Sequence, residues 1–138
     1  MAIKVFLDAN VILEAYLNRK HSSDASAILS LIADNNIQGF TTPSVIQICI
    51  YFLEKEMSAK ELSQLFISLL QYIELINTNK SSMIDAFTSG ANDFEDAILY
   101  HTAIGHNLHY FLTFDNKFAK SMQNVLPVVS PAQFLKLL

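Results

Sequence analysis

Short segments with strand character alternate with longer amphipathic segments along the whole chain. The short segments, most of them apolar, predict strands at 3–7, 38–42, 73–76, 110–113 and 125–129. Apolar residues at helical spacing predict helices at 10–17, 23–35, 44–56, 58–72, 81–88, 93–104 and 116–122, and a short final helix begins at Ser130-Pro131. Such alternation predicts a three-layer α/β/α fold around a mostly parallel sheet of roughly five strands.

Local capping motifs support two of the predicted helices. Pro43 suits the first turn of the helix at 44–56, with Thr42 as its N-cap. Ser58 and Glu61 have the spacing of a capping box at the start of the next helix. These two helix starts are therefore fixed by side chains as well as by periodicity.

The composition fits one domain that spans residues 1–138. Of the 138 residues, 51% are hydrophobic, which is enough for one sizeable core, and neither a repeat nor a low-complexity run interrupts them. The lone Cys49 lies in an apolar run and excludes an internal disulfide, so a reducing, cytoplasmic setting fits best. No apolar run is long enough to span a bilayer, and we expect no membrane association.

The net charge of −4 provides no global field that would attract a polyanion. This balance weakens the case for a role in which the protein wraps DNA or binds nucleic acid nonspecifically. If the chain acts on nucleic acid, it must do so locally, through bound metal ions or a small basic patch.

Carboxylates from three chain segments fall at one predicted edge of the sheet. Asp8 directly follows the first strand, Asp115 follows the strand at 110–113, and Asp93, Glu95 and Asp96 open the helix before that strand. In open parallel sheets, ligands bind outside the carboxyl ends of the strands. Oxygen ligands suit Mg²⁺ or Mn²⁺, which can activate water for attack on phosphorus. The segments therefore predict a divalent metal site.

Each of these acids also has a purely structural interpretation. Asp8 and Asp115 precede helices and can act as N-caps. Asp93 and Asp96 stand three residues apart, like the two ends of a capping box. Glu95 can face solvent or stabilise the N-terminus of its helix. Position alone leaves both interpretations open.

Four segments together resemble the PIN-domain family in their order and spacing, and they cover essentially the full length. They read FLDANVILEAYLNRK, GFTTPSVIQICIYFLEK, DFEDAILYHTA and FLTFDNKFAK. The resemblance implies that Asp8, Asp96 and Asp115 are the first, third and fourth acids of a metal site. Thr113 matches a position that commonly supports this site through its hydroxyl group.

The sequence departs from the family pattern at the second acid. The usual Glu falls at Ile48, which cannot bind a metal ion. Ser44 lies one turn earlier on the same helix face and is a second-tier candidate that could hold a water. Asn10, beside the first acid, and Asp93 are the other second-tier candidates. Three acids can balance one ion, but they weaken the case for two.

The resemblance further implies Mg²⁺- or Mn²⁺-dependent cleavage of RNA, often by a homodimeric toxin that pairs with an antitoxin protein. Arg19, Lys20 and His21, together with Lys117 and Lys120, supply the few cations available for RNA phosphates, unless they form only a solvated surface.

The change at Ile48 favours an alternative, a weakly active or inactive PIN-like module that binds RNA or a protein. A phosphoacceptor receiver domain fits less well, because Asp8 has no adjacent acid and no Lys ends the final strand.

Overall fold

The central sheet has five parallel strands in the order β3-β2-β1-β4-β5. The computed structural model describes residues 2–121 and 125–138. The strands are β1 (Lys4–Leu7), β2 (Gln38–Thr41), β3 (Ile73–Leu75), β4 (Tyr110–Leu112) and β5 (Val128–Val129). The predicted sheet is confirmed. Only β5 is much shorter than expected, because Pro127 has no N–H to donate and the strand begins after it.

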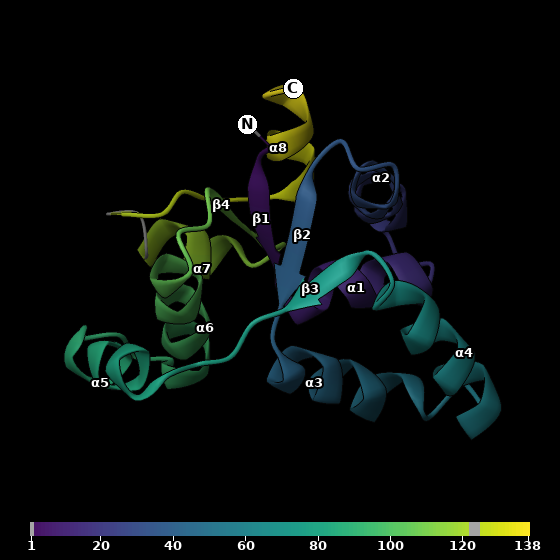
Figure 1. The fold of residues 1–138 in the computed structure, drawn as a ribbon, viewed down its shortest axis with the longest axis horizontal. Coiled ribbons are helices and arrows are strands. Elements are labelled where there is room, and N and C mark those ends of the chain that lie inside the picture. The colour runs from purple at the N-terminus through teal and green to yellow at the C-terminus, as the bar shows by residue number, and fades with distance from the viewer. Residues whose placement is uncertain (1, 122–124) are drawn as a thin grey trace.

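Helices cover both faces of this sheet (Figure 1). They are α1 (Ala9–Tyr16), α2 (Ser22–Ala33), α3 (Pro43–Leu53), α4 (Ala59–Leu69), α5 (Lys80–Thr88), α6 (Phe94–Gly105), α7 (Asn116–Ser121) and α8 (Pro131–Lys136). In Figure 1, α5, α6 and α7 lie on one side of the strands, and α1, α2 and α4 lie on the other. The fold is thus the predicted three-layer α/β/α arrangement. The predicted end of the seventh helix, at Met122, lies outside the described residues.

The two predicted capping motifs are present. The Thr42 side chain accepts a hydrogen bond from the Val45 amide, and Pro43 occupies the first turn of α3. Ser58 and Glu61 form the reciprocal bonds of a capping box at the start of α4. Both helices therefore begin where local side chains satisfy their free amides.

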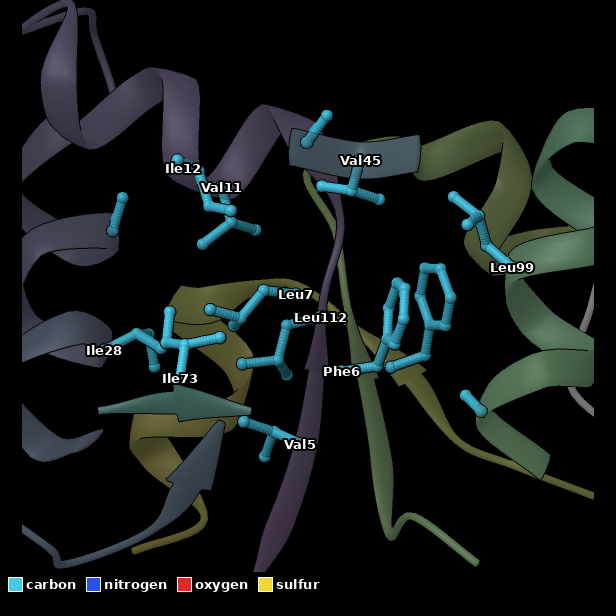
Figure 2. Close-up of a cluster of buried hydrophobic side chains, with 14 of the residues drawn as sticks. Val5, Phe6, Leu7, Val11, Ile12, Ile28, Val45, Ile73, Leu99 and Leu112 are labelled. Atoms are coloured by element: carbon cyan, nitrogen blue, oxygen red, sulfur yellow. The ribbon is translucent and has the colours of Figure 1, made fainter. Parts of the chain in front are cut away.

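The neighbouring strands β1 and β4 are buried on both faces, which is why they read as apolar runs rather than as alternating patterns. Val5, Phe6 and Leu7 are fully buried in β1. Figure 2 shows Ile28 of α2 and Leu99 of α6 approaching the strands from opposite sides. Burying a side chain of this size contributes roughly 1.5–3 kcal/mol to stability. The core therefore fixes the position of β1 between the two helical layers.

The order of the strands reverses between β1 and β4. From β1, successive strands run to β2 and β3 on one side and to β4 and β5 on the other. Leu7 and Leu112 are register partners, so Asp8 and Thr113 leave the sheet side by side. Such a reversal opens a crevice at the carboxyl ends of the strands, where open α/β sheets bind their ligands. Within the described ranges, no helix has the length and apolar character needed to cross a membrane.

Candidate active site

Asp8 is held at the end of β1 by both of its carboxylate oxygens. Oδ1 accepts a 2.8 Å hydrogen bond from the amide of Ala9, which makes Asp8 the N-cap of α1. Oδ2 accepts a 2.8 Å hydrogen bond from the hydroxyl of Thr113. The side chain is only 9% exposed. Asp8 therefore caps the helix, as its structural interpretation expects, and also faces the end of the neighbouring strand.

The Thr113 hydroxyl links three chain segments. Besides donating to Asp8, its Oγ1 accepts hydrogen bonds from the side-chain amide of Asn10 at 3.0 Å and from the backbone amide of Asp115 at 3.1 Å. The Asn10 side-chain oxygen in turn accepts from the Phe114 amide at 3.1 Å. This network fixes the start of α1 against the loop after β4, and it brings Asn10 and Thr113 into the neighbourhood that the sequence predicted.

Asp93 and Asp96 lie at the start of α6. Asp93 is the N-cap, and its Oδ1 accepts a 3.1 Å hydrogen bond from the Asp96 amide. Asp96 follows in the first turn and is partly buried. The pKa of Asp96 is raised to about 7 by burial and by the negative charges of Asp8, Asp93 and Asp115, with a further contribution from its hydrogen bond to Asp93. Asp96 thus shares an electrostatic environment with the other acids.

Asp8 has a raised pKa as well. Burial is the main cause, and hydrogen bonds from Thr113 and Ala9 oppose it, while the charges of Asp115 and Glu95 add to the increase. Desolvation and neighbouring negative charges both disfavour the ionised form of a carboxyl group. A cation near these acids would relieve this unfavourable electrostatic energy.

Asp115 caps α7 while its charge reaches the other acids. Its Oδ1 accepts hydrogen bonds from the amides of Lys117 at 3.0 Å and Phe118 at 3.1 Å. Its negative charge contributes to the raised pKa of both Asp8 and Asp96. Asp115 therefore acts as a cap, as its structural interpretation expects, and its charge also interacts with those of Asp8 and Asp96.

A cavity of about 450 Å³ opens beside these acids. Asp93, Asp96, Asp115 and Lys117 line it, and residues 89–92 between α5 and α6 form another part of its wall. Lys117, which the sequence predicted to contact substrate, therefore faces the same space as three of the carboxylates.

Arg19 and Lys20 lie in the loop between α1 and α2. The next residue, His21, stacks on Phe114 with ring centroids 4.8 Å apart and an interplanar angle of 16°. Because Phe114 directly precedes Asp115, this stacking holds the basic loop near the acidic edge of the sheet.

A second hollow, of about 550 Å³, lies between α3 and the start of α6. Its lining residues are Ser44, Gln47, Ile48, Tyr51, Phe52 and Glu95. Ser44 and Ile48 share this face, as their spacing predicted, and the Ser44 hydroxyl lies 2.8 Å from that of Thr42. Glu95 is exposed, as one of its interpretations expects, but the sequence gives no sign that it faces Ile48. Periodicity within one helix does not reveal which other helix lies opposite.

The donor set fits a hard divalent cation, because aspartate and glutamate oxygens are the ligands that Mg²⁺ and Mn²⁺ prefer. The uncompensated charges around Asp8 and Asp96 fit such an ion too. In the described part of the chain, however, no three side chains of His, Cys, Asp or Glu are grouped closely enough to hold a metal ion.

The sequence of this chain matches a known protein family. The PIN domain family model matches residues 4–117. No curated protein matches the sequence.

Three similar solved structures share the fold at low sequence identity. A toxin-antitoxin complex from Klebsiella pneumoniae has a TM-score of 0.70 and 18% identity, over 92% of this chain and 97% of that chain. VapBC2 from Rickettsia felis, bound to a promoter DNA fragment, has a TM-score of 0.68 and 19% identity, over 91% and 97%. The sarcin-ricin loop cleaving toxin VapC20 from Mycobacterium tuberculosis has a TM-score of 0.65 and 15% identity, over 89% and 99%.

Proposed function

Because the chain belongs to the PIN-domain family, we propose that it is a metal-dependent endoribonuclease that hydrolyses RNA phosphodiester bonds. One observation carries this proposal. Asp8, Asp96 and Asp115 come from three separate segments and interact electrostatically at the point where the strand order reverses. Carboxylates arranged in this way repel one another and are partly desolvated, and a bound divalent cation would offset both unfavourable effects.

Asp8, Asp96 and Asp115 would hold Mg²⁺ or Mn²⁺ through their carboxylate oxygens. When bound, such an ion polarises a phosphodiester oxygen and lowers the pKa of water. The role of Thr113 is to orient Asp8, because its hydroxyl fixes Oδ2 at 2.8 Å while leaving a lone pair of that oxygen available. Asn10 supports this arrangement by donating to the Thr113 hydroxyl.

Cations near the acids would position the RNA. Lys117 lines the cavity beside Asp96 and Asp115, where it can meet a phosphate group. Arg19 and Lys20 lie beside His21, whose stacking on Phe114 holds their loop close to that cavity. With a net charge of −4, the protein depends on these few local contacts for its affinity for RNA.

The proposal extends to a biological role as the toxin of a toxin-antitoxin pair, acting as a homodimer in the cytoplasm. Two of the similar structures are named as a toxin or a toxin-antitoxin complex. This similarity supports an antitoxin protein as a partner. Co-expression with the product of a neighbouring small open reading frame tests the pairing, because an antitoxin would relieve growth arrest that this chain causes alone.

Ile48 favours a second candidate function, a PIN-like module that binds RNA or a protein with little catalysis. Its side chain stands where the family resemblance expects an acid, and it cannot bind a cation. The variant Ile48→Glu separates the two candidates. If RNA cleavage appears only in this variant, the natural chain is a binding module, and if the natural chain already cleaves RNA, the first proposal holds.

RNA cleavage by the purified chain tests the main proposal. We expect cleavage with Mn²⁺ or Mg²⁺ and none with a chelator. Asp115→Asn should lower the cleavage rate by at least about a hundredfold, which is the typical effect of removing one preorganised electrostatic interaction from a catalytic site. Asp85→Asn, on the exposed surface of α5, is the matched control. Equal cleavage by wild type and Asp115→Asn would contradict the proposed site.

A further inference from the structure

Ile48, which stands where the family resemblance expects the second acid, shares a hollow with a carboxylate from another helix, that of Glu95. Ser44 and Ile48 of α3 line one side of the 550 Å³ hollow, and Glu95 of α6 lines it as well. The hollow is open, and no other acid of the described chain lines it. Ile48 and Glu95 thus face one space although they lie 47 positions apart in the sequence.

The charge of Glu95 also reaches the first acid of the site. Its carboxylate interacts electrostatically with that of Asp8, which lies at the end of β1. Glu95 is exposed, and no hydrogen bond or ion pair fixes its side chain among the described residues. Glutamate has one more rotatable bond than aspartate, so the carboxylate of Glu95 can sample several rotamers.

We infer that Glu95 supplies, from the first turn of α6, the carboxylate that α3 lacks at Ile48. Glu95 would bind the divalent cation either directly or through a coordinated water. This inference rests on the proposed function, because it concerns the same metal site. It would give the site four carboxylates, Asp8, Glu95, Asp96 and Asp115, and so supply the negative charge that position 48 lacks.

The side chains around Glu95 suit this role. Ile48, Tyr51 and Phe52 border the hollow with apolar surface. None of the other side chains that line the hollow is charged, so none of them forms an ion pair with Glu95. An acid placed on α3 in addition would add a further negative charge to the same space, so Glu95 and an acid at position 48 should substitute for one another.

Titration of the full chain with Mn²⁺ by isothermal calorimetry tests the inference without depending on activity. We expect Glu95→Gln to weaken Mn²⁺ binding about tenfold, at the low end of losses seen when groups that support a metal site are removed. Glu56→Gln, which neutralises an exposed carboxylate in the turn after α3, is the matched control and should change the affinity less than twofold. Unfolding of Glu95→Gln without metal should occur at the wild-type temperature or above it, because a like charge has been removed.

The double variant Glu95→Gln with Ile48→Glu provides the second measurement. We expect it to recover most of the lost affinity, whereas Ile48→Glu alone should improve wild-type binding by a smaller factor. Such non-additivity is the signature of two groups that serve one place. Wild-type affinity in Glu95→Gln, or an equal effect of Ile48→Glu in both backgrounds, would overturn the inference and leave the proposed function intact. If the wild-type chain does not bind Mn²⁺, the proposed function fails and the inference fails with it.

Discussion

The hydroxyl of Thr113 donates a 2.8 Å hydrogen bond to Oδ2 of Asp8, and it joins residues that lie 105 positions apart in the sequence. Pairing of β1 with β4 makes this contact possible, because Leu7 and Leu112 are register partners and the next residues diverge from the sheet together. The position of the first acid thus depends on the strand order, and Thr113 transmits this order to the site.

Replacing Thr113 with Val should destabilise the protein and weaken its metal site. The substitution preserves the side-chain shape but removes the hydroxyl partner of Asp8 Oδ2, of the Asn10 side-chain N–H and of the Asp115 backbone N–H. Leaving buried polar groups unpaired in this way costs about 1–3 kcal/mol. Urea unfolding of the metal-free protein measures the loss, and Mn²⁺ calorimetry measures the weakened binding.

The matched control is Thr113→Ser, which keeps the hydroxyl and loses only a methyl group. It should retain metal binding close to that of the wild type. If Thr113→Val and Thr113→Ser behave alike in both measurements, the hydroxyl does not orient Asp8.

The raised pKa of Asp96 makes the stability of the metal-free protein depend on pH. The group has a pKa of about 7 when folded, against about 3.9 in an unfolded chain. Because the folded protein favours the protonated carboxyl group, Asp96 contributes fully to the free energy of unfolding at pH values below its unfolded pKa. This contribution is lost as the pH rises through the folded pKa of about 7. Relative to Asp96→Asn, the wild type should therefore lose about 2 kcal/mol between pH 4 and pH 8, a value reduced because the group is partly exposed.

Mn²⁺ should reverse this trend, because the cation and the proton compete for Asp96. Below pH 7 the apparent Mn²⁺ affinity of the wild type should fall by up to about tenfold per pH unit. Chemical unfolding from pH 4 to pH 8, with and without Mn²⁺, checks both statements. A difference between wild type and Asp96→Asn that stays constant across this range would contradict the assigned pKa.

Lys117→Gln should weaken RNA binding more at low salt than at high salt. Loss of one phosphate contact to a single strand should reduce the slope of log affinity against log salt by about 0.7. Fluorescence anisotropy with a labelled RNA at several salt concentrations measures this slope. Lys136→Gln, at the end of α8, is the control with the same charge change, and an equal effect of both substitutions would indicate that Lys117 acts only through net charge.

Gly39→Ala should destabilise the fold by about 1–2 kcal/mol through overpacking. A Cβ at Gly39 would lie 2.5 Å from Cδ1 of Ile32, whose side chain is only 1% exposed and has little room to move. Ile32→Val removes that methyl group, so the double variant should lose less than the sum of the single losses. Thermal unfolding of the four proteins checks the prediction, and strict additivity would contradict it.

The sequence predicts the strands and helices of this fold well because apolar periodicity reports burial directly. Asp8 and Asp115 were identifiable for a related reason, since each follows a recognisable strand. Their convergence was harder to derive, because it depends on β4 pairing with β1, and no local pattern encodes that pairing. Glu95 faces the same hollow as Ile48 because of the way α3 and α6 pack. The sequence does not encode this packing in any local pattern, so from the sequence alone Glu95 is expected only to face solvent or to stabilise its helix.

The central claim is that Asp8, Asp96 and Asp115 bind a divalent cation that RNA hydrolysis requires. The most direct measurement is the single-turnover rate of cleavage of a labelled RNA at increasing Mn²⁺ concentration, with Mn²⁺ binding followed in parallel by calorimetry. The account predicts that both saturate at the same Mn²⁺ concentration, and that Asp96→Asn shifts both midpoints upward by at least about tenfold. Cleavage that persists in a chelator, or a rate that Asp96→Asn leaves unchanged, would contradict it.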